Sequence, residues 1–323
     1  MSLHLVSLTP AQSLGIPVAL VGSALLAVGA QLQQRGVSKV GRQRKEAEPS
    51  GLGIRQLLAL ARRPSWLLGT LFLGLAIAFQ LFSLYLAPLT VVQPLGALAL
   101  VITAVINARV TKVKLDGASI RAMGFCVGGV GVFVATAAVT TTTSPILEPQ
   151  LIAVSAILAV VLVLLGVGFV LFRKRLSRMF FVVGAGVLFG FVATLAKVLI
   201  GRVQTIFHDH FHLQATDWLT IVCLAGLLAA AALGTYFVQT AYSSGSPDVV
   251  VAGLTVIDPL VGVTIGIVVL GEAAHAPLWA GAVFVIAGML AIYGVIQVSR
   301  SGRRRAEESS KQDRYSKSAA EAH

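Results

Sequence analysis

The chain has 323 residues, of which 56% are hydrophobic and only 12% are charged. Soluble domains average about 25% charged residues, so the composition excludes a soluble enzyme and predicts an all-α, polytopic membrane protein. The net charge of +12 would suit a nucleic acid partner. However, the basic residues lie in short segments between apolar runs, and we interpret them as determinants of membrane topology, with no nucleic acid partner.

Nine apolar runs are long enough to cross a bilayer, since a spanning helix needs about 20 residues. In chain order, the sequence predicts spans near residues 16–33, 66–86, 91–107, 120–138, 151–172, 180–201, 218–242, 249–270 and 277–298. An odd number of spans places the two termini on opposite sides of the membrane.

The basic residues predict the orientation. Of the 25 Lys and Arg residues, all but Lys197 and Arg202 lie after spans one, three and five or in the C-terminal tail. A nine-span topology puts these segments on one face, and cytoplasmic loops carry the excess of Lys and Arg. We therefore expect a multi-pass protein of the cytoplasmic membrane with its N-terminus outside and its C-terminus in the cytoplasm.

The two halves of the chain show a weak internal repeat. Gln80 and Pro88 match Gln239 and Pro247, and the glycines at 124 and 131 match those at 281 and 288. Spans one to four thus correspond to spans six to nine in the opposite orientation, an inverted 4+1+4 arrangement. Inverted repeats favour a binding site near the membrane midplane and alternating access.

This repeat predicts the organisation of the chain. Residues 1–138 form the first repeat, with a cytoplasmic loop at 35–65, and residues 139–175 contain the linking fifth span. Residues 176–299 form the second repeat. The tail at 300–323 is basic and poor in apolar residues, so we expect it to be disordered.

Polar side chains in spans two and seven are candidates for substrate contact. Gln80 and Gln239 occupy matched positions, although membrane amides also serve as interhelical hydrogen-bonding groups. Tyr85 and Tyr242 are candidates on the same spans, with the aromatic belt at the membrane interface as the alternative.

Spans three and six supply further candidates. Gln93 and the hinge residue Pro94 lie at the predicted outer start of span three, where they line an outer vestibule. Lys197 lies near the outer end of span six, and its side chain either pairs with an acidic group or extends to the interface. The following loop carries His208, His210 and His212. It resembles a metal site, but a solvated loop is the favoured interpretation.

The eighth span contains the most informative pair, Asp258 and Pro259. A carboxylate at a helix centre costs about 2.5 kcal/mol or more, and proline there predicts a kink or break because it lacks an N–H. Both features favour a segment that lines a polar cavity. Asp258 would there bind a cationic substrate, exchange a proton or pair with Lys197. A carboxylate that hydrogen-bonds to neighbouring helices is the structural alternative.

Glu272, at the end of this span, is expected at the outer surface as a boundary or gate.

Two motifs carry a resemblance to known transporters. The run from Asp258-Pro259 to Gly271-Glu272 resembles the second-repeat signature of EamA-type members of the drug/metabolite transporter superfamily, with Asp258 where Glu is more usual. Ala87-Pro88 followed by VQPLGAL (92–98) resembles the NIPA-type magnesium transporter branch, as do the polar end of span one at 33–36 and the position of Lys197. The resemblance extends over residues 13–298.

The resemblance implies a secondary transporter that moves a small metabolite or organic solute by alternating access through a cavity walled by spans one, three, six and eight. A NIPA-like magnesium or divalent cation transporter is the first alternative, and a non-transporting membrane scaffold or lipid-handling protein is the second. No nucleophile–base constellation or ATP-binding motif is present, so we expect neither an enzyme nor a cofactor. The expected partners are the substrate and membrane lipid, with a homodimer left open.

Overall fold

A computed structural model describes residues 10–42, 64–111, 116–142, 146–172, 178–208, 218–243 and 247–321. Within these ranges the chain is helical and contains no strand. The helices are α1 (Pro10–Arg42), α3 (Pro64–Leu86), α4 (Leu89–Gly96), α5 (Leu98–Thr111), α6 (Gly117–Thr140), α7 (Glu148–Phe172), α8 (Arg178–His208), α9 (Trp218–Ser243), α10 (Pro247–Val268) and α11 (Leu278–Glu321). Nine segments of this described part are long and apolar enough to cross a membrane, which confirms the predicted all-α, nine-span class.

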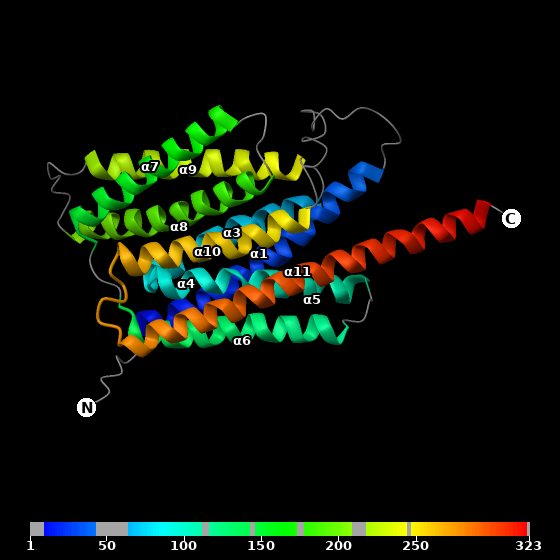
Figure 1. Ribbon diagram of the computed structural model, residues 1–323, viewed down its shortest axis with the longest axis horizontal. Coiled ribbons are helices and arrows are strands. Elements are labelled where there is room, and N and C mark those ends of the chain that lie inside the picture. Colours follow the sequence, from blue (N-terminus) through cyan, green and yellow to red (C-terminus); the bar gives the residue numbers. More distant parts are fainter. Residues whose placement is uncertain are drawn as a thin grey trace.

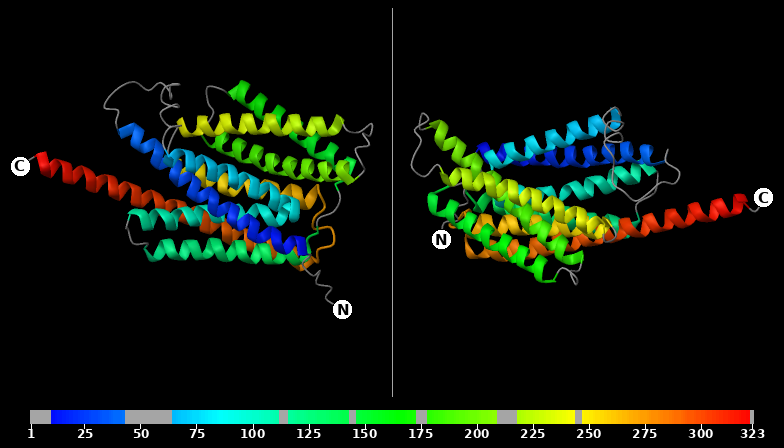
Figure 2. Two further views of the ribbon diagram at one scale, coloured as in Figure 1. Left: turned by 180° about the vertical axis from the view of Figure 1, so that it is seen from behind. Right: turned by 90° about the horizontal axis from the view of Figure 1, so that it is seen from above.

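The helices form an elongated bundle with their axes roughly aligned (Figures 1 and 2). Helix α1 begins at one end of the bundle, and α11 projects beyond the opposite end (Figure 1). Apolar side chains cover the outside, as on α7, where Val170 and Leu171 are 73% and 70% exposed. Such a surface suits lipid, because a large exposed apolar patch is rare on a soluble monomer.

Packing partners correspond between the two halves of the chain. Helix α1 packs mainly against α3, as α8 packs against α9. Two extensive contacts, α4 with α10 and α6 with α11, join spans that the predicted repeat makes equivalent. Helix α7, the predicted unpaired span, lies at the outside beside α8 and α9 (Figure 1). This arrangement agrees with the predicted 4+1+4 organisation.

The third span is broken, whereas the sequence predicts one continuous helix there. Helix α4 ends at Gly96 and α5 begins at Leu98. The N–H of Ala97 bonds to the carbonyls of Pro94 and Leu95, so the α-helical ladder is interrupted at this point. The predicted break at Pro259 does not occur, since α10 runs through it as one α-helix. Close packing of α10 against α8 holds the chain helical there despite the missing N–H.

The C-terminal tail also differs from the prediction. Helix α11 continues to Glu321, past the end of the ninth span at Ser301, whereas the composition predicts disorder after Arg300. An existing helix needs no new nucleus, and the Ala, Glu, Arg, Lys and Gln residues of the tail have high helix propensity.

Candidate functional site

The connection between α3 and α4 consists of Ala87 and Pro88, and a buried lysine closes its first end. Pro88 lacks the N–H that would bond to the Leu84 carbonyl in a continuing helix. Lys197 on α8 replaces it: its Nζ donates to Leu84 O at 2.5 Å and to Ala87 O at 2.7 Å. The helix dipole also favours a cation at the C-terminus of α3.

A buried glutamate closes the second end of this connection. The first N–H groups of any helix lack intrahelical acceptors, and Pro88 provides no side-chain cap for α4. The carboxylate of Glu272 accepts from Leu89 N at 2.7 Å, Thr90 N at 2.8 Å and Thr90 Oγ1 at 2.5 Å. Gly271, with φ of 71°, adopts the left-handed conformation that turns the chain before Glu272.

We refer to Lys197, Glu272 and the backbone groups that they bind as the α3–α4 clamp. Both charged side chains are buried, at 5% and 4% exposure, and they interact electrostatically. The clamp joins the two predicted repeats, because α3 and α4 lie in the predicted first repeat and both charged residues lie in the predicted second. The α3–α4 connection lies at the end of the bundle at which α1 begins (Figure 1).

The clamp corrects two expectations. Glu272 is buried rather than exposed at the outer surface, because the unpaired N–H groups of α4 attract it. Lys197 does not extend to the interface, and the acceptors seen for its ammonium are α3 carbonyls rather than Asp258. The signal that identifies this arrangement is Pro88 between two helices, which leaves carbonyls and amides that need charged partners.

Asp258 lies where α10 packs closely on α8. Gly186 and Gly190 of α8 allow the approach: a Cβ at Gly190 would lie 2.7 Å from Val261 Cβ and 3.1 Å from Asp258 O. Asp258 is half-buried as a residue. Its Oδ1 is buried and has no hydrogen-bond partner among the described residues. The carboxylate therefore has an oxygen that is withdrawn from water and accepts no hydrogen bond from the part of the chain that the structure describes.

Gln93 of α4 packs against α10 at Gly262, which lies one helical turn after Asp258. It is 5% exposed and lies against Gly262, where a Cβ would be 3.0 Å from Gln93 Nε2. That Nε2 also has no partner within the described part of the chain. One turn further, a Cβ at Gly266 would lie 3.0 Å from Thr90 Oγ1. Residues four apart share a helix face, so Asp258, Gly262 and Gly266 form one row that faces α4.

The remaining predicted site residues do not join this row. Gln80 is half-buried on α3, and Gln239 is exposed on α9. Tyr85 is 47% exposed and stacks on Phe82, with ring centroids 6.1 Å apart. It lines a lateral cavity of about 540 Å³ between α3, α8 and α9. Roles in substrate contact for these residues stay predictions.

Two further candidates lie outside what the structure describes. The side chain of Tyr242 and the loop after His208 are not among the described residues, so the predicted role of Tyr242 and the histidine metal site stay untested. Among the residues that are described, no group of three or more His, Cys, Asp or Glu side chains is placed to hold a metal ion.

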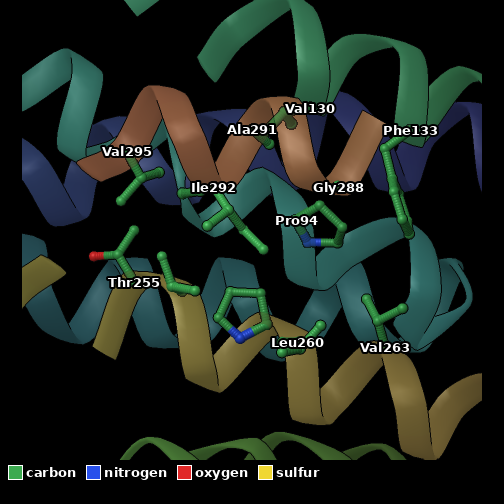
Figure 3. Close-up of a pocket in the computed structure, with 13 residues that line it drawn as sticks. Pro94, Val130, Phe133, Thr255, Leu260, Val263, Gly288, Ala291, Ile292 and Val295 are labelled. Carbon is green, nitrogen blue, oxygen red and sulfur yellow. The ribbon is translucent and has the colours of Figure 1, made fainter. Parts of the chain in front are cut away.

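A second cavity, of about 80 Å³, lies between α4, α6, α10 and α11 (Figure 3). Its walls are apolar and include Pro94, Phe133, Leu260 and Val263, with Thr255 at one side (Figure 3). Pro259 contributes to the lining but Asp258 does not. This cavity therefore does not form a polar route to the carboxylate.

The described residues contain nine helical segments that are long and apolar enough to cross a membrane, and these define a polytopic integral membrane protein. A comparison with protein families finds that the model of the family Magnesium transporter NIPA matches residues 11–211. Because this is more than half of the chain, the protein belongs to the NIPA magnesium transporter family, which lies within the drug/metabolite transporter-like superfamily and is a family of transporters, not of enzymes. Searches of curated proteins and of solved structures found no match.

The family match confirms the NIPA-type resemblance, whereas the EamA-type resemblance of residues 258–272 stays a prediction. The family match includes the α3–α4 connection, Gln93 and Lys197. Asp258 and Glu272 lie beyond its end, so their roles rest on the geometry of this chain.

Proposed function

We propose that the protein carries Mg²⁺ or a similar divalent cation across the membrane. The observation that carries this proposal is the NIPA family match over residues 11–211. It favours the cation alternative over the small metabolite that the superfamily resemblance alone suggests.

The environment of Asp258 supports the proposal. Burying an ionised carboxylate without a partner is costly, and Asp258 Oδ1 has no partner among the described residues. A bound cation would neutralise that charge. Magnesium prefers oxygen ligands, dehydrates reluctantly and usually keeps several waters, so a single carboxylate with a few neutral oxygens is a suitable protein contribution for a transient site.

We further propose that the cation passes between the two halves by alternating access. Both α4 and α10 contribute to the contact between the halves, and Asp258 lies on the row of α10 that faces α4. The α3–α4 clamp ties the halves together at the N-terminal end of the bundle, so that the cation path would be closed there in this conformation.

Purified protein in liposomes tests the function directly. We expect saturable Mg²⁺ uptake that protein-free liposomes lack, with uptake by Asp258→Asn reduced about tenfold or more, since contacts to charged groups contribute about 1.5–3 kcal/mol. Asp116→Asn is a matched control, because Asp116 is an exposed cap of α6 that accepts from Ser119 N and lies away from the proposed path. Absence of divalent cation uptake by the unmodified protein would contradict the proposal.

A further inference from the structure

The break in the third span takes one α-helical donor from a backbone carbonyl next to the proposed path. In a continuing α-helix the N–H of Ala97 would bond to Gln93 O, but it bonds to Pro94 O and Leu95 O instead. The carbonyl of Gln93 therefore loses the N–H of Ala97 as its α-helical donor. It also lies at the C-terminal end of the half-helix α4, where the helix dipole is negative and attracts cations. Carbonyls at such half-helix ends bind cations in other membrane transporters.

The side chain of the same residue adds a second neutral group. Gln93 is buried, and its Nε2 has no hydrogen-bond partner in the described part of the chain. A carboxamide presents either its oxygen or its NH₂ group in the same volume, since a half-turn exchanges them. Gln93 therefore has an amide group that no described contact holds in one orientation.

The register of α4 against α10 brings these groups toward Asp258. Thr90 lies against Gly266 and Gln93 lies against Gly262, so the two helices run in opposite directions along this contact. The next turn of α4 is the break at Ala97, and the next turn of α10 in that direction carries Asp258. A Cβ at Gly96, beside the break, would meet no atom within 4 Å, which leaves room that a larger residue would reduce.

We propose that Asp258 and Gln93 form one cation site at the α4–α5 break, with oxygens from the Asp258 carboxylate, the Gln93 side chain and the Gln93 main-chain carbonyl. The inference rests on the proposed function and deepens it. About three protein oxygens leave about three of the six positions around Mg²⁺ for water. The donors are all hard oxygens, so the site takes a partly hydrated divalent cation rather than a metal that prefers nitrogen or sulfur ligands.

Substitutions at Gln93 test the site through the concentration dependence of uptake. Gln93→Ala removes one ligand, and we expect its KM for Mg²⁺ in liposomes to rise about tenfold with Vmax unchanged. Gln93→Glu adds a second carboxylate, so its KM should fall and its Vmax should fall as well, because tighter binding slows release. Gln297→Ala on α11 is the matched control and should leave both parameters unchanged.

A binding measurement in detergent separates this inference from the proposed function. A ligand that binds only the folded state raises the melting temperature, and we expect Mg²⁺ to raise it for the unmodified protein and for Gln297→Ala but much less for Gln93→Ala. If the unmodified protein takes up Mg²⁺ but the Gln93 variants keep its KM and its Mg²⁺-induced melting shift, the site is wrong while the function stands. If uptake is absent altogether, the function is wrong. In that case the Mg²⁺-induced change in melting temperature alone tests the proposed site. The site is wrong if Mg²⁺ raises the melting temperature equally in all variants, or in none of them.

Discussion

At the residue scale, the α3–α4 clamp shows how one proline determines the positions of two distant charges. Pro88 ends α3 and begins α4 with no N–H of its own, leaving carbonyls on one side and N–H groups on the other. Lys197 and Glu272 satisfy these groups through four hydrogen bonds, and Glu272 accepts a fifth from the Thr90 hydroxyl. Both charges are buried and interact electrostatically, so we expect the loss of one to destabilise the other.

The clamp predicts strong coupling between its two charged residues. Lys197→Met leaves Leu84 O and Ala87 O unsatisfied and deprives Glu272 of its opposite charge. Removing one of two buried opposite charges that are hydrogen-bonded in this way costs about 3–5 kcal/mol. In a double-mutant cycle measured by unfolding in detergent, the combined Lys197→Met/Glu272→Gln change should cost clearly less than the sum of the single changes. Additive effects would show that the two charges act independently.

The sequence predicts which charged residues are candidates for a functional role, but it does not predict the groups that they contact. Asp258 stands out because a carboxylate inside an apolar run is rare, and Lys197 stands out for the same reason. The position of Glu272 could not be predicted, since its acceptor role depends on N–H groups 182 and 183 residues earlier in the chain. The residues near Glu272 in the sequence do not indicate a contact with a segment so far away in the chain.

At the element scale, the broken third span is the feature that most affects the proposed site. Pro94 is buried on α4 and removes the N–H that would bond to Thr90 O, and the ladder is interrupted soon afterwards at Ala97. The expected break at Pro259 is absent because α10 is packed tightly on α8. A proline therefore predicts a missing hydrogen bond reliably, but the surrounding helices decide whether the axis breaks.

Restoring the missing N–H of the third span should trade activity for stability. Pro94→Ala permits a continuous helix from α4 into α5, and an interior proline costs a helix about 3 kcal/mol. We therefore expect a higher melting temperature together with reduced Mg²⁺ uptake, because the Gln93 carbonyl would regain the N–H of Ala97 as its α-helical donor. Pro17→Ala is the matched control, since Pro17 lies inside α1 and should change stability without reducing uptake. Unchanged uptake by Pro94→Ala would contradict the role of the break.

At the scale of the whole molecule, the length of the apolar runs predicts the number and order of the spans because each must match the bilayer thickness. The correspondence of packing partners between the halves was predicted only through a few matched residues such as Gln80 and Gln239. The broken span and the helical tail could not be predicted, because one depends on tertiary packing and the other on continuation of an existing helix.

The predicted orientation of the molecule is open to a labelling experiment. The native thiols Cys126 and Cys223 are 0% and 1% exposed, so a membrane-impermeant maleimide should not reach them. We expect Pro10→Cys, at the start of α1, to react in intact cells. Arg304→Cys, in the exposed part of α11, should react only after permeabilisation. The reverse pattern would place the N-terminus in the cytoplasm.

The central claim is that the carboxylate of Asp258 binds the transported cation, and comparing Asp258→Glu with Asp258→Asn in the liposome uptake assay tests it most directly. Both variants keep a polar side chain, but only glutamate keeps the negative charge. We predict that Asp258→Glu retains substantial Mg²⁺ uptake and that Asp258→Asn loses most of it. If Asp258→Asn transported Mg²⁺ as fast as the unmodified protein, the claim would be contradicted.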